Sequence, residues 1–221
     1  MPFVAALSDK DQLRAIHLYK TGKSARQVAE AFEVKKDAVY YALRKHDIAR
    51  RSASENSRIR FDAKPLSYRI KNRQTPKEER LKLAAVMLYW AEGYKAGTHT
   101  VDFANSDPEI ALIFRRFLSE ICRVDETRVR GHIYCYEGQD PAMLTTYWSK
   151  LLQIPKEQFI KPYIKKAAAP GPRGPRMTNG LVHICYSDKK LLAQILAWIG
   201  EYRQDLTNKR VGGGVVNRNR L

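Results

Sequence analysis

The sequence predicts an α+β protein in which a small unit of three helices precedes a larger unit, a four-stranded sheet backed by helices. Two observations favour this class: helix-capping residues ahead of apolar stretches, and short alternating stretches typical of strands. A chain of 221 residues is long enough for one medium-sized domain and a small one. We expect the helical unit at 1–48, a basic linker at 49–76, the α+β domain at 77–205 and a flexible basic tail at 206–221.

Three short helices are expected in the first 48 residues. Ser8 and Ser24 are good N-caps, and Asp11 and Gln27 follow them at the three-residue spacing of a capping box. The first helix would cover residues 8–20, the second would follow Ser24, and the third would run over about 36–45. A tight turn would separate the last two helices.

The segment from Gly22 to Val34, GKSARQVAEAFEV, with the short helix that follows it, is similar to the helix-turn-helix of resolvases and many small bacterial regulators. This resemblance implies that the helix at about 36–45 enters the major groove of DNA. Lysine and arginine reach guanine edges or phosphates, and a tyrosine hydroxyl suits a phosphate. The alternative is a three-helix unit that binds protein. The side chains offered to the groove are Lys35, Lys36, Tyr40, Tyr41 and Arg44.

The net charge of +17 implies an anionic partner, most often nucleic acid. Residues 1–80 carry 19 Lys and Arg against 10 acids, and residues 155–221 carry 13 against 4. The block between them is close to neutral. In the expected linker, Arg50 and Arg51 would lie along phosphates or in a minor groove, although a solvated tether has the same composition. RNA binding would give the same total charge and stays open as a third reading.

One helix is expected at the centre of the α+β domain. Thr75 is its N-cap, Pro76 suits its first position and Glu78 completes a capping box. The stretch that follows, LKLAAVMLYWAEGYK at 81–95, is apolar on nearly every side, so we expect this helix to be buried. It ends in Glu92, and Gly93 is expected to stop it in a left-handed conformation. A carboxylate at the negative end of a helix costs roughly 0.3–1 kcal/mol unless a cation lies near it.

Strands are expected at 98–103, 128–136, 159–165 and 180–186. Helices are expected after the cap Ser106, after the turn at 137–141 and after the cap Ser187-Asp188, and the proline-rich segment 167–179 is expected to be a flexible loop. Residues two apart on a strand share a face. The basic side chains expected to face DNA from the sheet are therefore Arg128 with Arg130, and Lys161 with Tyr163 and Lys165.

The stretch at 81–95, together with the segments FANSDPE, YWSKLLQIP and KPYIKK, resembles LAGLIDADG homing endonucleases. The resemblance implies that two such helices pack side by side and that each ends in an acid that binds a divalent metal, Mg²⁺, beside the DNA backbone. Glu92 takes the place of that acid, whereas Met87 and Trp90 depart from the family pattern. With one such helix per chain, two acids would meet only in a homodimer. Asp102, Lys161 or Lys165 would assist the two acids in the cleavage reaction.

Two functions follow from this resemblance. The first is a metal-dependent endonuclease that cleaves double-stranded DNA as a homodimer. The second is a non-catalytic transcriptional regulator with a degenerate LAGLIDADG fold. We expect no membrane span, because no apolar run approaches about 18 residues, and no signal peptide, because the N-terminus lacks a charged leader. Three cysteines suit a reduced compartment, which predicts a cytoplasmic protein.

Overall fold

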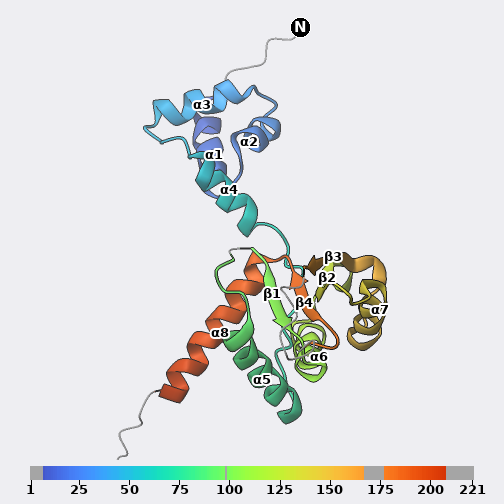
Figure 1. Ribbon diagram of the computed structural model, residues 1–221. Helices are drawn as coiled ribbons and strands as arrows, with labels where there is room; N and C mark the ends of the chain where they lie inside the picture. Colours follow the sequence, from blue (N-terminus) through green and yellow to red (C-terminus); the bar gives the residue numbers. More distant parts are fainter. Residues whose placement is uncertain (1–6, 98, 167–176, 208–221) are drawn as a thin grey trace, which may run out of the picture. The chain divides into compact units, whose positions relative to one another are not determined.

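The computed structural model describes residues 7–97, 99–166 and 177–207 and confirms the α+β class. The chain divides into two compact units, Met1–Pro65 and Leu66–Leu221 (Figure 1). Most of the expected tail at 206–221, and most of the proline-rich loop, lie outside the described residues.

The first unit holds α1 (Asp9–Lys20), α2 (Ala25–Ala31), α3 (Lys36–Lys45) and α4 (Ala53–Asp62). The three predicted helices are confirmed with their caps: Ser8 accepts from the Asp11 amide, and Ser24 and Gln27 form a full capping box. The core of this unit consists of small and aliphatic side chains with one tyrosine. Its fully buried members are Ala15, Val28, Val39, Ala42 and Leu43.

The stretch predicted as a linker, 49–76, contains the boundary between the two units, and each of its halves belongs to one of them. Ser52 and Glu55 form a capping box that starts α4 in the first unit. Farther along, the Arg69 amide donates to the Cys122 carbonyl (3.0 Å) and the Lys71 amide to the Ile121 carbonyl (2.9 Å), which ties residues 66–71 to the second unit. Backbone hydrogen bonds of this kind hold a segment in place regardless of its charged side chains.

The second unit begins with α5 (Pro76–Glu92) and carries a four-stranded sheet in the order β1-β4-β2-β3. β1 pairs with β4, and β4 with β2, in antiparallel fashion, whereas β2 and β3 are parallel. Asp107, rather than the predicted Ser106, caps α6, and its carboxylate accepts from the amides of the first turn. The remaining elements are β1 (Val101–Asn105), α6 (Pro108–Arg116) continued by a π-helical turn (Phe117–Ile121), β2 (Val129–Tyr136), α7 (Pro141–Leu152), β3 (Phe159–Lys165), β4 (Leu181–Tyr186) and α8 (Lys189–Thr207).

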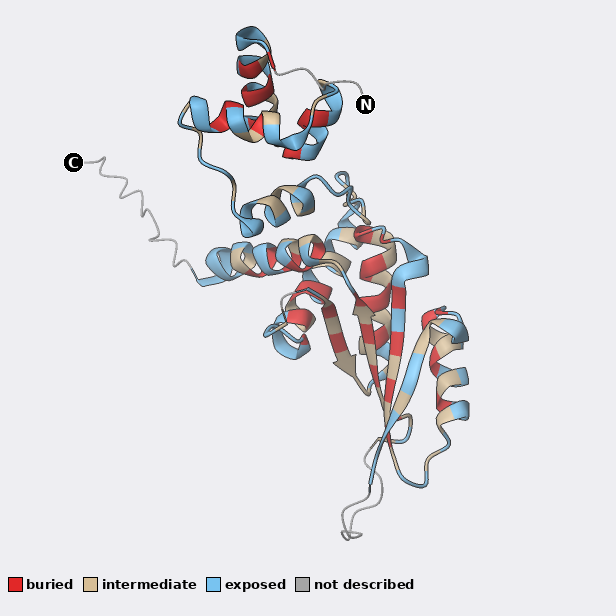
Figure 2. Ribbon diagram, turned by 90° about the horizontal axis from the view of Figure 1, so that it is seen from above, coloured by how far each residue is buried: buried red, intermediate tan, exposed pale blue. Residues whose placement is uncertain are grey.

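Helices α5 to α8 form a layer on one face of the sheet, and the core lies between the two layers (Figure 2). Alternate residues of β2 and β4 are buried against the helices, and the residues between them are partly exposed on the other face, which we call the open face. Stacked aromatic rings fill the core between α5, α6 and β1. The ring of Phe114 lies 4.3 Å from that of Phe103 and 5.5 Å from that of Tyr89.

The expectation that α5 is buried on nearly every side is wrong. Ala85, Val86 and Tyr89 are fully buried in the core, but Leu83 and Trp90 on the other side of the helix are 42% and 40% exposed. The helix therefore has one core face and a second face on which Leu83 and Trp90 are only partly covered by the described chain.

Candidate nucleic-acid interface

The end of α5 is built around a close approach of the backbone to Tyr89. Gly93 has φ −71° and ψ 145°, so the predicted left-handed stop is wrong and the chain leaves the helix extended. A side chain at Gly93 would place its Cβ 2.5 Å from both the Tyr89 ring and the Tyr89 carbonyl oxygen. Glycine is needed here for space. The extended exit then forms a bridge to Phe103 of β1.

We expect Gly93→Ala to lower the free energy of unfolding by about 1–3 kcal/mol, because the added methyl overpacks a site closed on one side by backbone. Chemical denaturation followed by circular dichroism measures the change. Gly200→Ala is the matched control: Gly200 lies within α8 with nothing near its Cβ position, so alanine there should stabilise by up to about 1 kcal/mol. A Gly93→Ala protein as stable as the wild type would contradict the steric account.

Glu92 is exposed at the last position of α5, and it forms no hydrogen bond or ion pair within the described part of the chain. Lys95 places a positive charge at the helix end, but it binds backbone carbonyls there and not the Glu92 carboxylate. Its Nζ donates to the carbonyls of Trp90 (2.8 Å) and Gly93 (2.9 Å). The negative end of the helix is thus compensated while the Glu92 carboxylate stays available.

The Glu92 end of α5 lies beside β1, since Gly93 is bridged to Phe103 and the Tyr94 amide donates to the Asp102 carbonyl (2.9 Å). Asp102, a predicted helper, lies on the open face and is already engaged. Its carboxylate binds Nδ1 of His183 at 2.9 Å. Asp102 is therefore positioned by a neighbouring strand and is not a free second acid.

Aromatic and histidine rings occupy the centre of the open face, which sequence reasoning missed. The ring of Tyr134 lies 4.4 Å from that of His183, 4.7 Å from His132 and 5.1 Å from Tyr163. Burial, followed by the nearby His183, lowers the pKa of His132, which favours its uncharged form at neutral pH. The alternation of His132 and Tyr134 along one strand was the signal for this cluster. The open face is thus less cationic at its centre than predicted.

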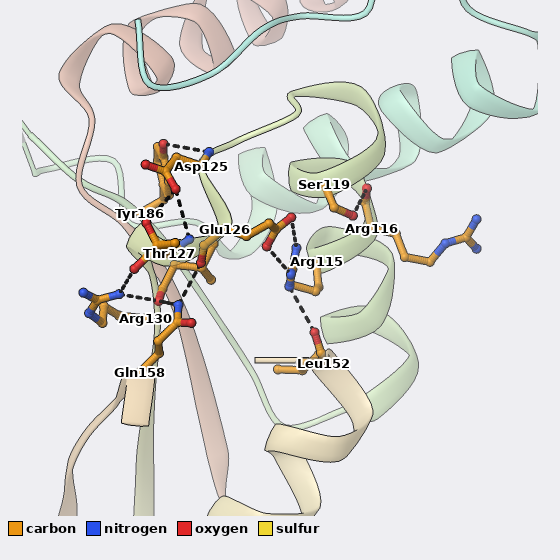
Figure 3. Close-up of polar contacts among 11 residues, drawn as sticks. Arg115, Arg116, Ser119, Asp125, Glu126, Thr127, Arg130, Leu152, Gln158 and Tyr186 are labelled. Atoms are coloured by element: carbon orange, nitrogen blue, oxygen red, sulfur yellow. Dashed lines mark hydrogen bonds and ion pairs between the residues drawn. The ribbon is translucent and has the colours of Figure 1, made fainter. Parts of the chain in front are cut away.

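The two arginines predicted to face DNA from β2 are held by backbone carbonyls. Arg128 precedes the strand, in a 3₁₀ turn at Glu126–Arg128, so the two-residue period does not relate it to Arg130. Its Nη2 donates to the Ser187 carbonyl (2.6 Å). Arg130 Nη1 donates to the carbonyls of Thr127 (2.7 Å) and Val129 (2.8 Å), as Figure 3 shows for Thr127.

Nearby, a third arginine ties helices together. Arg115 Nε donates to the Leu152 carbonyl at the end of α7 (3.0 Å), and Nη2 pairs with Glu126 (2.5 Å; Figure 3). The guanidinium is almost fully buried and has both of its partners within the fold. This cluster is structural.

The prediction that Lys161, Tyr163 and Lys165 share a face of β3 is wrong for Lys161. His132 of β2 lies opposite Ile160, but Tyr134 lies opposite Tyr163, so β3 has one extra residue between these pairs. This bulge puts Lys161 out of phase with the other two. Tyr163, at 53% exposure, and Lys165 remain on the open face beside Tyr134 and Tyr136.

In the first unit, the structure sorts the predicted DNA-binding residues into two groups. Lys35, Tyr41 and Arg44 are exposed on or beside α3, and Tyr41 is 56% exposed. The other group lines a cavity of about 600 Å³ between α2, α3 and α4. Its members from the prediction are Lys36, Tyr40, Arg50 and Arg51.

Within the described residues of one chain, no group of three His, Cys, Asp or Glu side chains could hold a metal ion. No protein-family model, curated protein or solved structure matches the chain. Among the described residues, no helix is both long and apolar enough to cross a membrane.

Proposed function

We propose that the protein binds double-stranded DNA as a homodimer and reads it with α3. The observation that carries this proposal is the division of α3 into two faces. Val39, Ala42 and Leu43 are buried in the first unit, and the opposite face exposes Tyr41 and Arg44. A short amphipathic helix that follows a tight turn and exposes cations and aromatic rings suits a major groove.

The variant Arg44→Ala tests the proposal that α3 contacts the bases of the DNA. We expect this change to weaken binding to the preferred DNA site by about tenfold, because one arginine contact to a base edge contributes about 1–3 kcal/mol of discrimination. Arg14→Ala is the matched control, since Arg14 is an exposed arginine of the same unit on α1. Fluorescence anisotropy on sites selected from a random library measures both. Equal losses in the two variants would show that only total charge matters.

The partly exposed face of α5 supports the homodimer. Leu83 and Trp90 share one helix face and are exposed, Met87 between them is half-buried against the core, and Tyr94, at 57% exposure, follows just past the end. Exposed apolar stripes of this kind mark interaction sites. In a two-fold dimer the same stripe covers itself, so pairing through α5 would bring the two Glu92 ends toward the symmetry axis.

The activity that we propose for this dimer is metal-dependent cleavage of DNA. The two Glu92 carboxylates are the residues that would hold Mg²⁺, which, when bound, supplies an activated water and stabilises the leaving oxygen. Each carboxylate is exposed, unpaired within the described chain and located beside β1, at the edge of the sheet.

A non-catalytic DNA-binding regulator is the second candidate, and Trp90 favours it. This bulky side chain stands on the apolar stripe one turn or less from Glu92, so it would hold two α5 helices farther apart than small residues do. Supercoiled plasmid incubated with the wild-type protein and Mg²⁺ separates the candidates. Nicked or linear product supports the endonuclease, and retarded but intact plasmid supports the regulator.

A further inference from the structure

The cavity between α2, α3 and α4 concentrates positive charge. It is lined by Arg26, Lys36, Arg50, Arg51 and Arg60, against a single acid, Glu30. Arg26 is neutralised, because its Nε lies 2.7 Å from the Glu30 carboxylate. The other four cations form no ion pair within the described residues. Four unpaired positive charges in one concave site repel one another, and a bound anion would relieve this repulsion.

Packing on aromatic rings fixes two of these guanidinium groups. Arg50 lies over the Tyr40 ring at 3.6 Å, and Arg51 lies over the Tyr19 ring at 4.0 Å. Arg51 also donates through Nη2 to the Lys23 carbonyl, and its backbone amide donates to the Tyr19 hydroxyl (3.0 Å). These contacts hold the donors in place before any ligand arrives, which lowers the entropy cost of binding.

One donor in this site lacks an acceptor. The Nε of Arg51 is buried and has no hydrogen-bond partner in the described chain. A buried donor left unpaired is costly, and a small shift of the Arg51 guanidinium would let this atom pair with a bound anion. A phosphate oxygen is the natural acceptor beside several arginines.

Helix α4 brings the remaining cation to the cavity. None of its residues is buried, and its contact with the three-helix core includes Ile59 beside Gly22. Only Asn56, Ile59 and Phe61 of α4 are half-buried, so apolar burial holds this helix less firmly than it holds α1 to α3. Arg60 reaches the cavity from α4, whereas Arg58, on the same helix, pairs with Asp62 (3.9 Å) and does not line the cavity.

We propose that this cavity binds a phosphate group, supplied by the DNA backbone, with Lys36, Arg50, Arg51 and Arg60 as its ligands. The inference rests on the proposed DNA binding for the source of the phosphate. Helix α4 then acts as the second wall of a backbone clamp and sets the distance between this phosphate and the bases facing α3.

Arg60→Ala and Arg58→Ala in the full chain test the proposal, because both remove one exposed arginine from the same helix. One arm titrates sodium pyrophosphate by calorimetry, and the other measures binding to a random-sequence duplex over a range of salt concentrations. We expect Arg60→Ala to weaken pyrophosphate binding by about tenfold and to lower the salt slope by about one. Arg58→Ala should change neither. Circular dichroism checks that both variants fold.

The outcomes are distinguishable. If pyrophosphate binding depends on Arg60 but the duplex slope does not, the phosphate site stands and its assignment to the DNA backbone is overturned. If wild-type protein does not bind pyrophosphate, and both variants affect the duplex equally, the cavity proposal fails while DNA binding stands. If the wild type does not bind duplex at all, the proposed function fails, and the pyrophosphate arm still decides whether the cavity takes phosphate.

Discussion

Glu92→Gln is expected to abolish Mg²⁺-dependent cleavage of supercoiled plasmid while leaving DNA binding intact. The amide keeps the shape of the side chain but loses the charge that a divalent cation requires. We expect a loss of at least about 100-fold in the cleavage rate, since changes to residues that only support metal ligands already cost about 10–100-fold. Gel analysis of nicked and linear product measures the rate.

Stability should change little. The Glu92 side chain is exposed and unpaired within the described residues, and Lys95 already compensates the negative end of α5. Removing the charge should therefore change the free energy of unfolding by no more than about 0.5 kcal/mol. A variant that is as stable as the wild type, or more so, and inactive cannot be inactive through misfolding. Glu109→Gln, on the exposed first turn of α6, is the control and should cleave normally.

Two results would contradict this prediction. Cleavage that persists in Glu92→Gln would show that Glu92 takes no part in the chemistry. A wild-type protein that binds plasmid without cutting it would favour the non-catalytic regulator.

The positioning of Glu92 depends on contacts that are separate from its charge. Gly93 allows the extended exit toward β1, and Lys95 compensates the helix end, so the same geometry would persist in a chain that had lost activity.

Local sequence signals predicted the elements well. The capping boxes at Ser24 and Thr75 start α2 and α5, and β3 spans the predicted residues, because these signals act within a few residues of the chain. Ser106 was mistaken for a cap because its neighbour Asp107 has the same capability. The sequence contains both candidates, and only the backbone conformation selects between them.

Features that depend on distant partners were not predicted. Residues 66–71 looked like linker because they are basic, but their backbone groups bond to residues near Cys122. The bulge in β3 moves Lys161 out of phase through its pairing with β2, which no periodicity in β3 alone reveals. The cavity around Arg51 likewise requires α4, a helix with no buried residues and hence with no apolar pattern to predict it.

Trp90→Glu is expected to convert a dimer into a monomer. Covering the exposed two-fifths of the Trp90 side chain contributes about 1 kcal/mol, and two-fold symmetry counts each substitution twice. The dissociation constant should therefore rise by at least about tenfold, and further because two carboxylates would face each other near the axis. Sedimentation equilibrium at several protein concentrations measures it. Tyr147→Glu, on α7 with nearly the same exposure, 38% against 40%, should leave the dimer unchanged.

Trp90→Glu also tests whether cleavage requires the dimer. Because one chain offers only Glu92 at the end of α5, a monomer would lose cleavage even though every Glu92 carboxylate is still present. Binding of each first unit to a half-site should survive in the monomer with lower overall affinity, since the two reading helices are no longer linked. If Trp90→Glu stays dimeric, the chains associate through another surface. The two Glu92 carboxylates would then not meet through α5, and a non-catalytic DNA-binding regulator would become the better proposal for the function.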